Sequence, residues 1–270
     1  EDYFQGHFPG APVMPGVLQI ASMSQVANAV LRKRGLQSPD CFYWMSGIRR
    51  LKFRNPASPG DRLLTDVTIQ AIDSNSGRVT VTAIVHTGET TNCEGTLDLV
   101  PTTEDALLSR QRGFAPATES ESTERGQTVL EATDIMGVIP HRFPFLLIDR
   151  VLELDKDNSR IRVLKNITGH EPLLEGYPVP VLPGYIQAEI GAQAGCTLAL
   201  SLPENRNKLA YFMSIDEAHF TQPVVPGDQL LIDVVVSTRG RFGRGSGTMS
   251  VDNQLVGELT LKFAVVDREA

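Results

Sequence analysis

Apolar positions along the chain predict two long helices, each built mostly from hydrophobic residues. From Pro15 to Leu31 the apolar side chains cover much of a helical circumference, and a proline suits the first turn of a helix. Arg32 to Gly35 then places cations and a glycine where this helix should end. A second helix is predicted from Pro183 to Leu200. Helices this apolar are expected to be buried.

Long β patterns rich in Val, Ile and Thr follow each helix. They are Leu63–Ile72, Arg78–His86 and Cys93–Val100, then Leu230–Ser237, Gly247–Val251 and Leu255–Val266. Polar turn residues at 73–77 and at 252–253 predict hairpins between neighbouring strands. The pattern therefore predicts an α+β fold in which an antiparallel sheet wraps around a central helix.

The same order of motifs occurs twice along the chain. The matched blocks are 12–19 with 180–187, at an offset of 168, 52–61 with 219–228, at an offset of 167, and 94–97 with 257–261. Recurring Pro-Gly turns would explain one matched block but not three. The chain is therefore interpreted as a duplication.

The duplication predicts two repeats and a linker. Repeat 1 is expected at 1–100 and repeat 2 at 128–270, while 101–127 is rich in Thr, Ser, Glu and Arg and reads as a solvated linker. A short helix is expected in this linker near 104–112. Repeat 2 has a long stretch before its central loop that repeat 1 lacks, so we expect the N-terminal strand of repeat 1 to be missing.

Composition excludes several classes of function. The 270 residues are 41% hydrophobic and 21% charged, as in an ordinary folded protein. A net charge of -7 argues against a nucleic-acid partner. No apolar run approaches the roughly 20 residues of a membrane helix, and the chain does not open with a secretory signal. Three widely spaced cysteines form no metal-ligand pattern, so we expect no metal and a cytoplasmic location with reduced thiols.

Two segments resemble one known family. The stretch Phe4–Leu18, which reads Phe-Gln-Gly-His-Phe-Pro-Gly-Ala-Pro-Val-Met-Pro-Gly-Val-Leu, resembles the signature loop of the bacterial beta-hydroxyacyl-acyl-carrier-protein dehydratases of the hotdog fold. Pro140–Leu147 and both Pro-Gly-Asp blocks resemble the same family. The similarity spans nearly the whole chain outside the linker. It implies a double hotdog of two tandem repeats, an acyl carrier protein as partner, and no cofactor.

The resemblance also implies one composite active site. In this family a histidine comes from the loop of one subunit and an acidic residue from the central helix of its partner. Repeat 1 keeps the histidine, His7, but has Ala21 at the acid position; repeat 2 keeps the acid, Glu189, but has Tyr177 at the histidine position. His7 and Glu189 are therefore expected to meet between the repeats, and the other pair to form a dead site.

These residue types suit the dehydration of a 3-hydroxyacyl thioester. Histidine is a suitable base for removing the C2 proton. Glu189 lies among small and apolar residues, so burial should favour the neutral acid that protonates the departing hydroxyl. The N–H of Gly16, at the start of a helix, can polarise the thioester carbonyl.

A further set of residues is predicted to contact the substrate: Phe8, Val13, Pro15, Trp44, Tyr211 and Gln193. The resemblance places Trp44 and Tyr211 where the family has aromatic residues of the acyl tunnel, although both could equally be ordinary core residues. Gln25 and Gln193 are expected to tie their helices to loops. The histidines at 86, 141, 170 and 219 have no second member and are predicted to be structural.

Acyl carrier protein is acidic, so a basic patch is expected around Arg49–Arg54 or Arg239–Arg244. Two other functions remain open from the sequence: a hotdog thioesterase, and a non-catalytic partner of an acyl-chain-building assembly. A dehydratase-isomerase is less favoured, because that branch of the family carries aspartate at the acid position. Ordinary family members assemble from several subunits, so a homo-oligomer is expected, with a trimer of the fused chain as one form.

Overall fold

The computed structural model describes residues 2–38, 40–108, 128–169, 171, 174 and 180–267. In the first half, residues 2–108, the elements are α1 (Tyr3–Gly6), α2 (Gly16–Lys33), β1 (Phe42–Phe53), β2 (Leu64–Ile72), β3 (Val79–Thr87), β4 (Thr90–Thr102) and α3 (Glu104–Leu108). In the second half, residues 128–267, they are β5 (Leu130–Glu131), α4 (Ala132–Val138), β6 (Arg150–Asp155), β7 (Arg160–Asn166), α5 (Gly184–Leu200), the 3-10 turn Pro203–Asn205, β8 (Lys208–Phe220), β9 (Gln229–Arg239), β10 (Phe242–Val251) and β11 (Gln254–Asp267).

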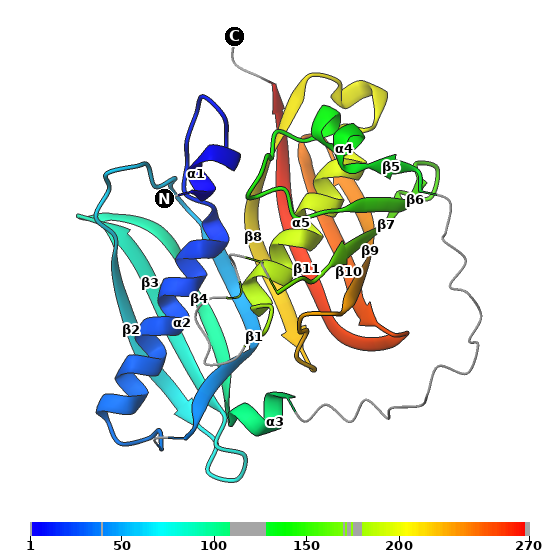
Figure 1. The fold of residues 1–270 in the computed structure, drawn as a ribbon. Coiled ribbons are helices and arrows are strands. Elements are labelled where there is room, and N and C mark those ends of the chain that lie inside the picture. The colour runs from blue at the N-terminus through cyan, green and yellow to red at the C-terminus, as the bar shows by residue number, and fades with distance from the viewer. Residues whose placement is uncertain are drawn as a thin grey trace, which may run out of the picture.

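One sheet of eleven strands runs through both halves in the order β2-β3-β4-β1-β8-β11-β10-β9-β7-β6-β5. The sheet curves around two helices, α2 in the first half and α5 in the second (Figure 1). The predicted helices and β patterns correspond to these elements, and the α+β fold is confirmed. Among the helices of the described residues, none is long and apolar enough to cross a bilayer.

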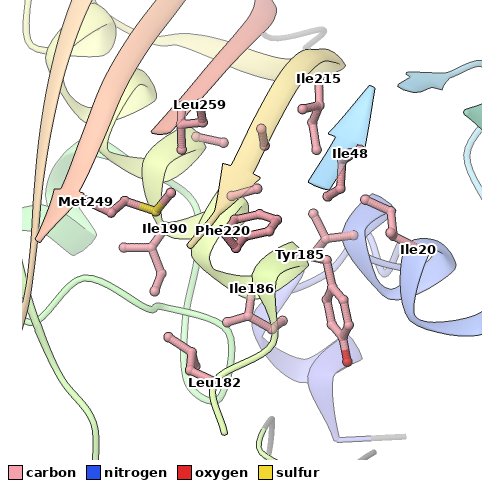
Figure 2. Packing of buried hydrophobic residues seen from close by; sticks show 14 of the residues in the cluster. Ile20, Ile48, Leu182, Tyr185, Ile186, Ile190, Ile215, Phe220, Met249 and Leu259 are labelled. Carbon is pink, nitrogen blue, oxygen red and sulfur yellow. The ribbon is translucent and has the colours of Figure 1, made fainter. Parts of the chain in front are cut away.

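The two halves join at an antiparallel pairing of β1 with β8. Ile48 lies opposite Ala218 in this pairing, and both side chains are fully buried. Figure 2 shows Ile20 and Ile48 of the first half in the same apolar cluster as Ile215 of the second. The backbone hydrogen bonds and the core therefore continue across the seam between the halves.

The two central helices differ in how fully they are covered. Every residue of α5 from Gly184 to Ala199 is buried, because α4 and β7 pack on this helix in addition to β8–β11. On α2, Gln25 and Ala29 remain exposed. The difference explains why α5 has an almost uniformly apolar sequence, whereas α2 carries polar residues on one side.

Both helices begin at a glycine covered by an aromatic ring. A Cβ on Gly16 would lie 2.7 Å from the ring of Phe53, and a Cβ on Gly184 would collide with the ring of Phe220. No other residue fits this approach without moving the ring. In each half of the chain, the Pro-Gly motif and the Phe motif that recur in the sequence therefore pack against each other.

The linker prediction falls mostly outside the described residues. Strand β4 continues to Thr102, two residues beyond the predicted end of repeat 1, and α3 occupies the start of the predicted linker helix. Residues 109–127 are not described. The division into repeats and linker therefore stays a prediction at its boundaries.

Candidate active site

His7 lies in the loop between α1 and α2 and is held there by Val13. Its Nδ1 is 2.8 Å from the carbonyl oxygen of Val13, which can only accept, so the Nδ1–H donates and the lone pair resides on Nε2. The N–H of Val13 donates back to the carbonyl of His7 at 2.9 Å. The ring of Phe8 stacks on the imidazole with centroids 3.9 Å apart. His7 thus has a fixed ring and one nitrogen available as a base.

Glu189 lies in the second turn of α5 with its side chain buried. Its Oε1 accepts a hydrogen bond from Nε2 of Gln193, one turn further along, at 3.0 Å. Burial raises the pKa of Glu189 to about 7, and the hydrogen bond from Gln193 opposes this rise only in part. The carboxyl group can therefore hold a proton near neutral pH.

His141 connects these two residues. Its Nε2 is 3.6 Å from Oε1 of Glu189, and its ring meets the His7 ring edge-on with centroids 5.5 Å apart. The ring of Phe8 lies against it as well, at 5.0 Å between centroids. The structure thus brings His7 of the first half and Glu189 of the second half against one shared side chain.

His141 was predicted to be structural, and its position between His7 and Glu189 was not expected. The signal was present, since His141 belongs to the Pro140–Leu147 stretch that carries part of the family resemblance. Nothing in the spacing of that stretch indicates that it packs against α5, some 48 residues further along the chain.

Residues 139–147, which we call the strap, fasten the two halves of the site together. The N–H of Arg142 donates to the carbonyl of Gly6 at 2.9 Å, directly beside His7. On the other side Gln193 donates to the carbonyl of Phe145 at 2.9 Å and accepts from the N–H of Leu147 at 3.0 Å. Gln193 therefore ties α5 to a loop, and its amide is occupied by protein groups.

Burial also keeps the two histidines uncharged. It lowers the pKa of His7, and the hydrogen bond to Val13 opposes this only partly. The pKa of His141 is lowered to about 3, mainly by burial and in addition by the neighbouring His7 and Arg142. Near pH 7 the cluster therefore contains two neutral imidazoles and a carboxyl group close to its own pKa.

The start of α2 lies nine residues after His7. Pro15 caps the helix, one position earlier than the first-turn place predicted for it, and Gly16 is the first helical residue. The N–H groups of a first helical turn have no intrahelical acceptor. Gly16 can therefore offer a backbone donor at the positive end of α2.

The two predicted tunnel aromatics have different surroundings. Trp44 is buried at the start of β1, opposite Val100 of β4. Tyr211 on β8 is 54% exposed, so its side chain faces largely into solvent and the structure does not bring it to the His7 cluster. The tunnel role of Trp44 stays a prediction.

The second site, which the sequence predicts to be dead, can be followed only in part. Ala21 is half-buried on α2, and Gln25, the counterpart of Gln193, is exposed. Tyr177 and His170 lie outside the described residues. The network around Glu189 thus has no equivalent at the matching positions of α2.

Two further expectations concern surface charge and metals. In the first predicted basic patch, Arg49 pairs with Asp98 at 2.7 Å and Arg54 with Glu94 at 3.0 Å, so two of its cations are neutralised within the first half. The described part of the chain contains no group of three or more His, Cys, Asp or Glu side chains placed to hold a metal ion.

Comparisons with known proteins agree on one family. The family model described as "FabA-like domain" matches residues 1–92 and 139–260. A 3-hydroxyacyl-[acyl-carrier-protein] dehydratase, FabZ, from Symbiobacterium thermophilum is 48% identical over 135 residues, which cover 49% of this chain and 94% of that protein. FabZ from Roseiflexus castenholzii is 45% identical over 140 residues, covering 51% of this chain and 97% of that protein. A single relative thus spans about half of this duplicated chain.

Solved structures match the chain over nearly its full length. The dehydratase domain of RzxB from Pseudomonas fluorescens superposes with a TM-score of 0.61 at 12% identity, covering 97% of this chain and 90% of that one. At this identity the likeness shows the fold alone. The predicted double hotdog is confirmed.

Proposed function

The chain belongs to the FabA-like domain family, and from this premise we propose that it dehydrates 3-hydroxyacyl thioesters of acyl carrier protein to trans-2-enoyl thioesters through one site between its halves. The relatives named as FabZ dehydratases support the reaction. The site that would carry it out consists of His7, Glu189 and the N–H of Gly16.

One observation carries this proposal: a histidine with a free Nε2 and a buried carboxyl group with a raised pKa converge on the same cluster from opposite halves. His7 and Glu189 both contact or face His141, as described above. Dehydration requires both groups at once, one to take a proton and one to supply it. A cluster with two bases and no acid, or with an ionised carboxylate only, would not suit the reaction.

The first step is removal of the C2 proton by His7. The Nε2 lone pair takes this proton, and the hydrogen bond from Nδ1 to Val13 stabilises the imidazolium that forms. The electron pair left on C2 delocalises into the thioester carbonyl. A donor at the start of α2, the N–H of Gly16, would bind the developing negative charge on the carbonyl oxygen.

The second step is loss of the hydroxyl from C3. Glu189 donates its proton to this oxygen, which leaves as water while the C2–C3 double bond forms. One proton passes from C2 to His7 and one from Glu189 to the hydroxyl, so the imidazolium and carboxylate must exchange a proton with each other or with solvent before the next turnover. No redox change occurs, so the reaction needs no electron carrier.

The proposed substrate includes acyl carrier protein because the relatives are named for substrates attached to it. The predicted homo-oligomer and the cytoplasmic location stay predictions.

The test is turnover of a 3-hydroxyacyl-carrier-protein, followed by mass spectrometry for loss of water. Removing a general acid or base costs about 10²- to 10⁴-fold in rate. We expect losses in this range for His7→Ala and for Glu189→Gln. His219→Gln, at an exposed position of β8, is the matched control and should retain full activity.

Tyr177→Phe tests whether there is one site, and it should also leave the rate unchanged. Release of free thiol without loss of water would identify a thioesterase instead. Absence of any reaction across several acyl chain lengths would favour a non-catalytic partner of an assembly.

A further inference from the structure

We propose that His141 is a positioning residue that, together with Gln193, orients the carboxyl group of Glu189 so that its acidic proton lies on Oε2. This inference rests on the proposed role of Glu189 as the acid. His141 does not have to touch the substrate for this purpose; it acts through Glu189.

Two nitrogen atoms converge on one oxygen of Glu189. Nε2 of Gln193 is 3.0 Å from Oε1 and can only donate. Nε2 of His141 is 3.6 Å from the same Oε1. This second separation is longer than a hydrogen bond, but catalytic hydrogen bonds are often long in a site without substrate and shorten when substrate binds.

The surroundings of the two ring nitrogens determine the tautomer of His141. Its Nδ1 is buried and has no hydrogen-bond partner among the described residues, whereas its Nε2 faces Oε1. A buried N–H without an acceptor costs more than a buried lone pair without a donor, because the N–H loses its bond to water outright. The proton is therefore best placed on Nε2, where the imidazole becomes a second donor to Oε1.

This tautomer determines which oxygen of the Glu189 carboxyl group carries the proton. An oxygen that accepts from two N–H groups has both lone pairs occupied, so it cannot also carry the acidic proton. The proton of Glu189 then resides on Oε2, the oxygen that neither Gln193 nor His141 contacts. Without the two donors the proton could sit on either oxygen, and the acid would be correctly oriented for only part of the time.

The surroundings keep His141 in this donor role. The titratable groups that face Glu189 or His141 are His7 across the seam, Cys196 on α5 and Arg142 in the strap. The neighbouring positive charge of Arg142 and the burial of the ring both disfavour protonation of His141. The imidazole therefore remains a neutral donor rather than an ion-pair partner that would strip the proton from Glu189.

The test compares His141→Gln, whose amide can still reach Oε1, with His141→Asn, whose amide is one carbon shorter, and His141→Phe, which has no donor. Steady-state turnover and its pH dependence are measured for each, with thermal unfolding as a check on folding. We expect His141→Gln to keep kcat within about threefold, and the Asn and Phe variants to lose about tenfold, the effect of one hydrogen bond.

The pH profile separates positioning from simple packing. The acid is active while protonated, so wild-type activity should fall as pH rises through the pKa of Glu189. Loss of a donor destabilises the carboxylate, so this fall should move to higher pH in the Asn and Phe variants but not in the Gln variant. If the Phe variant does not fold, the Asn and Gln pair decides.

The outcomes distinguish this inference from the proposed function. If Glu189→Gln is inactive but His141→Asn and His141→Phe keep the wild-type kcat and pH profile, His141 only fills space and the inference fails alone. If Glu189→Gln remains active, Glu189 is not the acid, and both proposals fail.

Discussion

Glu189 combines a catalytic requirement with a cost to stability, and both arise from its burial. A carboxyl group in water has released its proton at neutral pH, whereas the buried Glu189 has a pKa of about 7 and can still hold it. The same burial means that the ionised group is poorly solvated in the folded protein. The acid is therefore kept protonated at the expense of the folded state at alkaline pH.

Because ionised Glu189 destabilises the folded state, we predict that Glu189→Gln becomes more stable relative to wild type as pH rises. The pKa is about 7 in the folded protein, against an ordinary value of 4.5 for a glutamate in water. Because the folded pKa is the higher one, the folded state of wild type loses stability between these two values, by about 3 kcal/mol in total. Glutamine does not ionise, so the free energy of unfolding of the variant relative to wild type should increase from pH 4 to pH 8.

Chemical denaturation at the two pH values measures this difference. Glu258→Gln, at an exposed position of β11, serves as the control and should show no such change with pH. A constant difference between Glu189→Gln and wild type across this pH range would mean that Glu189 is not held protonated by burial.

At the scale of elements, the strap depends on the absence of a side chain at Gly6. A Cβ at this position would collide with the carbonyl oxygen of Arg142, which belongs to the backbone and cannot swing away. We predict that Gly6→Ala separates the His7 loop from the strap and lowers kcat about a hundredfold, since small displacements of reacting groups have effects of this size.

The matched control for this prediction is Gly137→Ala on α4. Its Cβ would meet no atom within 4 Å. It should leave kcat unchanged and stabilise α4 slightly, because alanine favours a helix over glycine. If Gly6→Ala has the turnover of wild type, the contact between strap and loop does not position His7.

The elements were predicted from the sequence far better than the contacts between them. The long helices α2 and α5 and the strands β2–β4 and β9–β11 followed from local patterns, because apolar runs and Pro-Gly starts are determined by nearby residues, whereas α1, α4 and the seam strands β1 and β8 were not predicted. The pairing of His7 with Glu189 was inferred only through the repeat and the family resemblance. The position of His141 between His7 and Glu189 was not predicted, because it depends on the hydrogen bond from the N–H of Arg142 to Gly6 and on a contact with α5. Neither interaction produces a periodic pattern in the sequence.

At the scale of the whole molecule, the single sheet and shared core predict cooperative unfolding. The seam between β1 and β8 is made of ordinary sheet pairing, and one apolar cluster contains residues from both halves. Differential scanning calorimetry should therefore show one transition, with equal calorimetric and van't Hoff enthalpies. Two separate transitions would show that the halves are independent units.

A substitution at the seam between β1 and β8 provides a second test of cooperative unfolding. Ala218→Asp would bury a charge between β1 and β11, opposite Ile48 and Leu259. It should lower the temperature of the whole transition rather than split it. Melting of the second half alone in this variant would contradict the single cooperative unit.

Because both halves of the sheet belong to one chain, their sequences can evolve separately. In a pair of identical subunits every mutation appears twice, so a change that helps one face of the pair is imposed on the other. Here β1 and β8 pair within a single chain, and each is encoded by its own stretch of the gene. Position 21 could become alanine while position 189 remained glutamate. The residues around α2 can consequently change under selection without any change in the residues around Glu189.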